Sequence, residues 1–216
     1  MKTLLLGSFL LGNLGLFVPA HDVVAPPTQV RFDSVDYRNI LHWTPPINAS
    51  SRQFYVQWKI YGEPQWLDVD GCQGITEHLC DLSRVTSTIN EWYYARVRAS
   101  ASRNSSTWSS SPRFSPRWDT KISPPTLKLK MTKQGIMVRV KPTRVLLKKI
   151  PNNLLYKVYL KHSNGDEEVF EMSSCCTKWT LPNMTHGTQY CLQAQTVVLM
   201  QSKRSARSPL VCVTTL

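Results

Sequence analysis

Short runs of alternating apolar and polar residues dominate the chain from residue 28 onward. Successive side chains of a β-strand point to opposite faces, so "YYARVRA", with Tyr93, Ala95, Val97 and Ala99 on one face, predicts a strand with one buried side. Comparable runs are "TQVRF", "NILHW" and "FYVQWKIY" in the first half, and "TLKLKM", "GIMVRV", "LLYKVYLK" and "YCLQAQTVV" in the second. No window of about 11 or more residues carries a helical period. The pattern predicts an all-β protein.

The strand pattern occurs twice at a nearly constant spacing. Pro26-Pro27-Thr28 is repeated 98 residues later as Pro124-Pro125-Thr126. Tyr93 and Tyr190, which open the penultimate predicted strand of each half, are 97 residues apart. Landmarks at nearly the same offset indicate a duplicated module of just under about 100 residues, which is the size of an immunoglobulin-type sandwich.

Trp and Cys positions distinguish between classes of sandwich. An immunoglobulin domain carries Cys in its second and sixth strands and Trp in its third. Here the second strand holds Trp43, and the sixth strand of the first module has no Cys. The sequence therefore predicts two fibronectin type III domains in tandem, residues 21–118 and 119–216, joined at a stiff, Pro-rich elbow. The Tyr that opens each sixth strand predicts a tyrosine corner, in which its hydroxyl bonds back to the chain just upstream.

The N-terminus has the layout of a secretory signal. Lys2 is followed by an apolar run from Leu4 to Val18 and by the small-residue cleavage pattern Val18-Pro19-Ala20. We expect residues 1–20 to be a signal peptide and the mature chain to begin at His21. No later apolar run approaches the roughly 18 to 20 residues of a membrane span. The expectation is a secreted, extracellular protein without a membrane span.

Six Cys are consistent with secretion, and their positions restrict the pairing. Cys72 and Cys80 bracket a small loop and are expected to pair. Cys191 faces away from the core side of its strand, and Cys212 lies on the adjacent final strand, so a second bridge between them is expected. Cys175 and Cys176 remain. Alternation suggests that Cys175 is a buried thiol and Cys176 an exposed one, and the alternative is a strained or intermolecular bridge.

Positive charge is concentrated in the second module. The chain has a net charge of +12, of which residues 119–216 contribute +10 and residues 21–118 only +1. A secretory signal argues against nucleic acid as the partner. The excess is either a solvated surface or a binding surface for a glycosaminoglycan or an acidic cytokine. The cations near the start of the module are Lys128, Lys130, Lys133, Arg139, Lys141, Arg144, Lys148 and Lys149.

Catalytic and cofactor motifs are absent from the sequence. The five His are scattered and lack the spacing of metal ligands. There is no Gly-rich phosphate loop, no nucleophile elbow and no pair of carboxylates in an apolar setting. We therefore expect a protein that is not an enzyme and binds no cofactor or metal.

Several segments resemble one receptor family. "NILHWTP", "VQWKIYGEPQW", "GCQGITEHLCDL", "YYARVRASA" and "WSSSPRFSPRWDTKISPP" are similar to the first domain of class II cytokine receptors, and "LLYKVYL", "MTHGTQYCLQA" and "LVCV" to the second. The resemblance implies a class II helical cytokine, similar to interleukin-22, as the partner. The end of the chain directly after the last predicted strand suggests a soluble decoy. The alternatives are the ectodomain of a membrane-bound receptor, or a fibronectin-type adhesion or matrix-binding module.

Loop topology places the expected ligand site at the elbow. The loops that meet there are the third-to-fourth and fifth-to-sixth strand connections of the first module, and the second-to-third and sixth-to-seventh connections of the second. The candidate ligand-binding residues in these loops are Tyr61, Gly62, Glu63, Thr88, Ile89, Leu147, Lys148, Met200 and Gln201.

These candidates have alternative explanations. Tyr61 is either an aromatic anchor for the ligand or an ordinary exposed residue at a strand end, and Leu147 and Met200 are either ligand contacts or local packing. Arg96 and Arg98 are expected to stack on Trp108 as a structural feature. The glycosylation sequons at Asn48, Asn104 and Asn183 all fall at poles far from the elbow.

Overall fold

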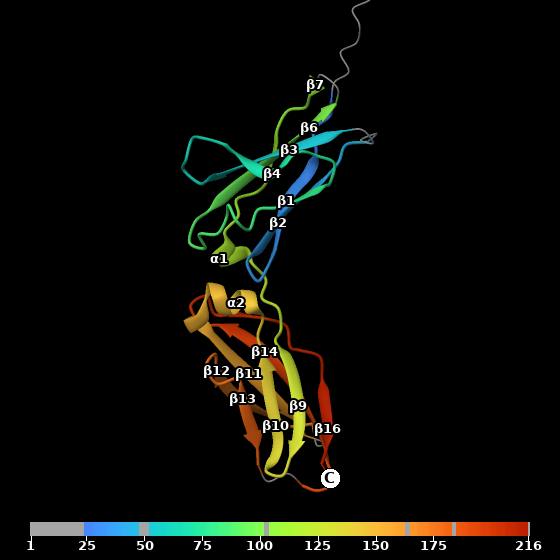
Figure 1. Ribbon diagram of the computed structural model, residues 1–216, viewed down its shortest axis with the longest axis vertical. Coiled ribbons are helices and arrows are strands. Elements are labelled where there is room, and N and C mark those ends of the chain that lie inside the picture. Colours follow the sequence, from blue (N-terminus) through green and yellow to red (C-terminus); the bar gives the residue numbers. More distant parts are fainter. Residues whose placement is uncertain (1–23, 48–51, 102–103, 163–164, 183–184, 216) are drawn as a thin grey trace, which may run out of the picture.

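The computed structural model describes residues 24–47, 52–101, 104–162, 165–182 and 185–215. The expected signal peptide and the sequons at Asn48 and Asn183 lie outside these residues. Figure 1 shows two β-sandwiches stacked end to end, which confirms the predicted fold class. No helix within the described ranges is both long and apolar enough to cross a membrane.

The first domain consists of two antiparallel sheets. One sheet has the order β1-β2-β5, and the other has the order β4-β3-β6-β7, with β8 also paired to β6. The strands are β1 (Thr28–Val35), β2 (Arg38–Thr44), β3 (Gln53–Ile60), β4 (Leu67–Ile75), β5 (Leu79–Asp81), β6 (Tyr93–Ala101), β7 (Asn104–Ser105) and β8 (Ser109–Ser110).

The second domain repeats this arrangement. A three-stranded sheet has the order β13-β10-β9, and a second sheet has the order β12-β11-β14-β15, with β16 also paired to β14. Tyr93 and Tyr190 therefore lie on equivalent strands, β6 and β14. The strands are β9 (Thr126–Thr132), β10 (Gly135–Lys141), β11 (Leu154–Lys161), β12 (Glu167–Ser173), β13 (Lys178–Leu181), β14 (Gln189–Val198), β15 (Lys203–Arg204) and β16 (Val211–Thr214).

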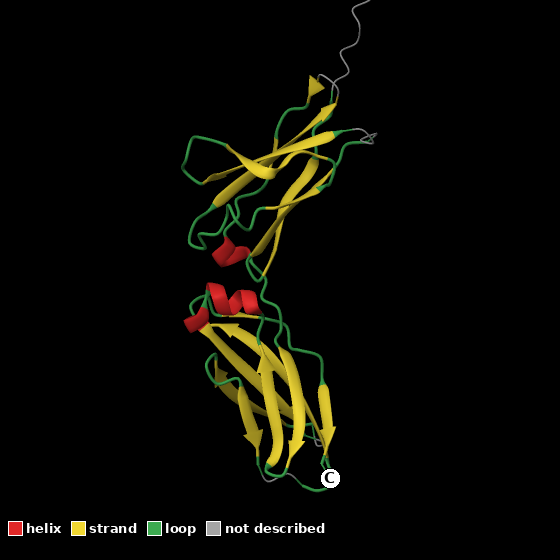
Figure 2. Ribbon diagram, in the orientation of Figure 1, coloured by secondary structure: helices red, strands yellow, loops and turns green. Residues whose placement is uncertain are grey.

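Short helical segments gather where the two domains meet (Figure 2). They are α1 (Pro116–Asp119), α2 (Arg144–Lys149) and the 3₁₀ turn η1 (Pro151–Asn153). Leu147 and Lys148, which were expected to lie in a loop, are therefore part of a short helix. Leu, Lys and Arg are good helix formers, but six residues are too few to show a helical period.

Each sandwich has its own apolar core, and both predicted tyrosine corners form. The Tyr93 hydroxyl donates to the Thr88 carbonyl at 3.0 Å, and the Tyr190 hydroxyl accepts from the Thr185 amide at 3.1 Å. Burial raises the pKa of Tyr93, and its hydrogen bond to Thr88 offsets this only in part. The disulfides are Cys72–Cys80 and Cys191–Cys212, the two pairs expected from the sequence.

Candidate functional site at the interdomain elbow

The β1–β2 turn of the first domain inserts a side chain into the second domain. Tyr37 is 3% exposed and belongs to the same buried cluster as Ile122, Leu146 and Val198. Asp36 and Tyr37 both have positive φ, 51° and 65°, a conformation that non-Gly residues rarely adopt. Burial raises the pKa of Tyr37, although the nearby Gln201 side chain opposes the shift. This contact of Tyr37 with the second core was not predicted from the sequence.

Hydrogen bonds between the domains surround this insertion. The Asp36 carboxylate accepts from the Ser123 amide at 2.9 Å and also from the Ser123 hydroxyl. The Lys203 ammonium donates to the carbonyls of Trp118 and of Thr120, the latter at 2.8 Å. Burial lowers the pKa of Lys203, and Asp119 opposes this shift. Because these bonds accompany apolar packing, the junction resembles a small core more than a flexible hinge.

The linker itself is bonded to the edge of β1. Lys121 donates its amide to the Ser34 carbonyl at 2.8 Å, and its carbonyl accepts from the Asp36 amide at 2.8 Å. The Tyr37 amide donates to the Thr120 hydroxyl at 2.9 Å. Because these bonds join the linker to the β1–β2 region, the linker packs as an extension of the first domain.

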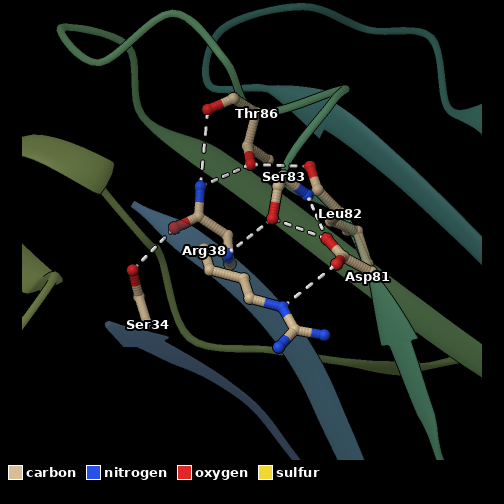
Figure 3. Close-up of polar contacts among 7 residues, drawn as sticks. Ser34, Arg38, Asp81, Leu82, Ser83 and Thr86 are labelled. Carbon is tan, nitrogen blue, oxygen red and sulfur yellow. Dashed lines mark hydrogen bonds and ion pairs between the residues drawn. The ribbon is translucent and has the colours of Figure 1, made fainter. Parts of the chain in front are cut away.

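A buried polar network supports the β1–β2 turn from within the first domain. The Asn39 side chain accepts from the Ser34 hydroxyl at 2.6 Å and donates to the Thr86 hydroxyl at 2.7 Å. The backbone amide of Asn39 donates to the Ser83 hydroxyl at 2.9 Å. Figure 3 shows Ser34 on β1 meeting Ser83 and Thr86, which both belong to the turn after β5. The network connects the β1–β2 turn to the β5–β6 connection, so these two parts of the elbow are held together.

Next to this junction, the first domain exposes an aromatic and basic surface. Tyr61 is 56% exposed, and its amide donates to the Trp92 carbonyl at 2.7 Å. The Arg113 guanidinium lies 5.4 Å from the centre of the Tyr61 ring and 4.2 Å from that of Trp92. The Tyr61 and Tyr94 rings are 6.2 Å apart. We call Tyr61, Trp92, Tyr94 and Arg113 the aromatic patch.

A concavity of about 230 Å³ lies beside the aromatic patch, under the β3–β4 connection. Apolar and polar side chains both contribute to it, which suits a surface that accepts a protruding side chain from a partner. Its lining residues are Trp58, Lys59, Ile60, Glu63, Gln65 and Leu67.

The second domain contributes an apolar turn. Leu199 and Met200, between β14 and β15, are 52% and 62% exposed. Lys148 on α2 is also exposed. In Figure 1 the β3–β4 connection and α2 lie to the same side of the junction, so one partner has access to both domains.

The predicted ligand residues fall into two groups. Tyr61, Gly62, Glu63, Thr88, Lys148 and Met200 are exposed around the junction. Ile89 and Leu147 are partly buried and pack on the core of the second domain, which supports the alternative of local packing for Leu147. The side-chain oxygen of Gln201 is buried without a hydrogen-bond partner in the described part of the chain. Contact with a ligand stays a prediction for all nine residues.

The glycosylation sequon at Asn104, which lies within the described residues, is remote from the aromatic patch. Asn104 is part of β7, which Figure 1 places at the end of the first domain farthest from the junction. A glycan on Asn104 would leave the elbow accessible. The expected glycosylation of Asn104 itself stays a prediction.

A stack of rings and guanidinium groups stiffens the first domain, as expected for Arg96 and Arg98. The Arg96 guanidinium lies between Trp66 and Trp108, at 4.2 Å and 4.4 Å from the ring centres. Arg98 lies 4.8 Å from Trp108 and 5.4 Å from Tyr55. Burial and the neighbouring Arg98 charge lower the pKa of Arg96. The participation of Trp66 was not anticipated.

The two remaining Cys are free and exposed. The interpretation of Cys175 as a buried thiol is therefore wrong. Alternation failed because β12 ends at Ser173 and β13 begins at Lys178, so the Cys pair lies in the intervening turn rather than on a strand. The two sulfurs are 3.3 Å apart, and the Ser173 hydroxyl lies 2.9 Å from the Cys175 sulfur.

We expect these thiols, when reduced, to differ in reactivity. The Ser173 hydroxyl and Cys176 lower the pKa of Cys175, whereas Cys175 raises the pKa of Cys176. Because the thiolate is the nucleophile, limiting iodoacetamide near about pH 7.5 should alkylate Cys175 first. Peptide mass spectrometry measures the ratio, and equal labelling would contradict the prediction. Ser173→Ala should slow alkylation of Cys175, whereas Ser174→Ala should not, because the Ser174 hydroxyl donates to the Pro151 carbonyl.

Within the described residues, no group of three or more His, Cys, Asp and Glu side chains could hold a metal ion. What the elbow offers instead is an exposed aromatic patch, an apolar turn and a packed, hydrogen-bonded junction between them. This arrangement suits protein binding, in which aromatic anchors and Arg contribute strongly.

Comparisons with known proteins agree with this geometry. The family profile described as tissue factor matches residues 2–108, and that described as interferon-alpha/beta receptor, fibronectin type III, matches residues 120–216. Interleukin-22 receptor subunit alpha-2 of Rattus norvegicus is 31% identical over 206 residues, which are 90% of this chain and 90% of that protein. Interleukin-20 receptor subunit alpha of Homo sapiens is 31% identical over 204 residues, 88% of this chain but 36% of that protein.

The fold is also that of a solved receptor. The crystal structure of the selenomethionine-substituted chicken interferon gamma receptor alpha chain has a TM-score of 0.78 and 26% sequence identity to this chain. The similarity covers 89% of this chain and 99% of that one, and therefore includes both domains.

Proposed function

The chain belongs to the class II cytokine receptor family, and we propose that it is a secreted decoy receptor that binds a class II helical cytokine at the elbow, interleukin-22 being the expected ligand. The family and the fold are non-enzymatic, and the two domains are of the extracellular receptor type. The relatives whose length this chain nearly matches are named for interleukin-22. Such a protein inhibits by occlusion, because a cytokine held at the elbow is withheld from signalling receptors.

The observation that carries the proposal is the aromatic patch beside a junction that is already ordered. Tyr61 is too exposed to contribute much to folding, yet its backbone is bonded to Trp92 and its ring faces Arg113. An aromatic side chain held in place without being buried loses little conformational freedom when a partner covers it. This is the physical situation of an interface anchor.

A binding screen tests the proposal. The purified chain is immobilised, and class II cytokines are passed over it, beginning with interleukin-22 and including ligands of the interleukin-20 and interleukin-10 receptor types. We expect one of them to bind with a Kd well below about 1 μM. If no cytokine bound at about 1 μM, the proposal would be contradicted.

A second measurement separates the decoy from the other candidates. If the chain withholds the cytokine, then preincubation should reduce signalling in cells with membrane-bound receptors, in proportion to the fraction of cytokine bound. Binding without inhibition would contradict the decoy role and favour a receptor ectodomain that cooperates with another subunit. Attachment to cells without cytokine would favour the adhesion module.

A further inference from the structure

One sheet of the second domain carries five exposed cations and no acidic residue on its strands. Strands β9, β10 and β13 form a three-stranded sheet whose inner face packs on the core. Each cation on these strands is exposed. We call this set the basic sheet face, and its members are Lys128, Lys130, Arg139, Lys141 and Lys178.

The strand register arranges these cations in rows. Arg139 on β10 pairs with Lys128 on β9 at one side and with Lys178 on β13 at the other. Neighbouring strands are about 4.8 Å apart, and alternate residues along a strand are about 6.8 Å apart. Lys130 and Lys141 therefore follow on the same face, one step away from the central row in opposite directions. Figure 1 shows the three strands side by side, with β10 running toward the elbow and β9 and β13 running away from it.

Acidic side chains do not compensate this charge. In the second domain the described Glu side chains that form ion pairs belong to β12, on the other sheet. Glu171 pairs with Lys157 at 2.8 Å, and Glu167 with Arg207 at 2.6 Å. None of the five cations forms an ion pair with a described residue. Like charges directly opposite one another destabilise a sheet, so we expect the row Lys128, Arg139, Lys178 to reduce the stability of this domain.

From this arrangement we propose that the basic sheet face binds a sulfated glycosaminoglycan. The face is flat and carries charges on a regular spacing, which suits an extended polyanion with repeating sulfate groups. Part of the polysaccharide fits into a shallow depression, whose lining residues are Lys128, Leu129, Lys130, Met137 and Arg139. The polysaccharide lies along the strands, from the β9–β10 turn near Lys133 toward Arg144 on α2.

The composition of the face favours a polysaccharide over an acidic protein. Protein interfaces are enriched in aromatic residues and Arg and depleted in Lys. Four of the five cations here are Lys, and the other outward positions of the central rows are Met137 and Thr180. No aromatic side chain points outward among them, so the face has no candidate for a protein-binding anchor. Sulfated polysaccharides are also the polyanions that an extracellular domain meets.

Heparin affinity chromatography of the whole chain tests the proposal. The variant Lys128→Thr, Arg139→Thr, Lys178→Thr removes the central row, and Thr suits the exposed face of a strand. The matched control, Arg84→Thr, Lys161→Thr, Arg204→Thr, removes the same charge from exposed positions elsewhere. On a simple cation exchanger both variants should elute earlier by the same amount. On heparin the face variant should lose most of its retention, while the control should shift only as much as on the exchanger.

Titration with size-defined heparan sulfate gives the corresponding affinities. We expect the face variant to bind at least about tenfold more weakly than the control at physiological salt, where screening acts over about 8 Å. Equal losses in the two variants would overturn the proposal and leave a nonspecific basic surface. Stronger retention on DNA or on acidic lipid vesicles than on heparin, lost in the face variant alone, would also overturn it and assign the face to that polyanion.

Stability and cytokine binding serve as independent controls. Removing a row of like charges should leave the melting temperature unchanged or raise it. The inference does not depend on the proposed function, because the face is separate from the aromatic patch. Cytokine affinity should therefore be retained in a variant that no longer binds heparin.

Discussion

Replacing Tyr37 by Ala is expected to destabilise the protein by about 3 kcal/mol or more, because truncating a buried aromatic side chain removes apolar burial and leaves a cavity. The side chain is 3% exposed and packs in the core of the second domain, although it belongs to the first. Urea denaturation measures the loss. Limited proteolysis of the segment around residues 120–123 should show a faster cut, since the linker bonds depend on the same turn.

The matched control for this variant is Tyr37→Phe. The Tyr37 hydroxyl is buried and has no hydrogen-bond partner of ordinary geometry among the described residues. Removing it therefore relieves an unsatisfied polar group and should leave stability equal or higher. If Phe were as destabilising as Ala, the hydroxyl rather than the packing would hold the elbow, and our account of the junction would be wrong.

Tyr61→Ala is expected to weaken binding of the cytokine by at least about 2 kcal/mol, or roughly 30-fold, with little change in the melting temperature. The expectation follows from its 56% exposure at the centre of the aromatic patch. Surface plasmon resonance with the cytokine identified in the screen measures the first quantity, and calorimetry the second.

Leu79→Ala is the control for Tyr61→Ala. Leu79 is 49% exposed, but it pairs with His42 near the end of β2 that is remote from the β1–β2 turn. Its truncation should leave cytokine affinity unchanged. Loss of folding in Tyr61→Ala without a separate loss of affinity would show that Tyr61 is structural.

The repeated landmarks in the sequence were sufficient to predict the two sandwiches. Alternation along β6 and β14 identified the core faces, and the Tyr at the start of each strand predicted its corner contact. These features depend on local periodicity, which a single sequence displays directly. The Cys191–Cys212 disulfide followed from strand order, which places the two residues opposite each other. The Cys72–Cys80 disulfide followed from the short loop that these residues bracket.

The elbow itself was only partly predictable. A turn with two residues at positive φ is ordinarily signalled by Asn or Gly, and Asp36-Tyr37 carries no such signal for its second residue. Nothing local indicates that Tyr37 packs on a core formed by residues about 85 to 160 positions later. The helix α2 and the turn at Cys175 are each too short to interrupt a pattern of alternation visibly.

The bonds that fix the linker also determine when the protein loses its interdomain freedom. In a two-domain receptor with a loose hinge, binding must also order the hinge, and the entropy lost in doing so lowers the affinity. Here the Asp36–Ser123 and Lys203–Thr120 contacts order the junction during folding. If the proposed cytokine binds this arrangement of the domains, association needs no search among domain angles. Differences in affinity between cytokines should consequently appear in their dissociation rates rather than in their association rates.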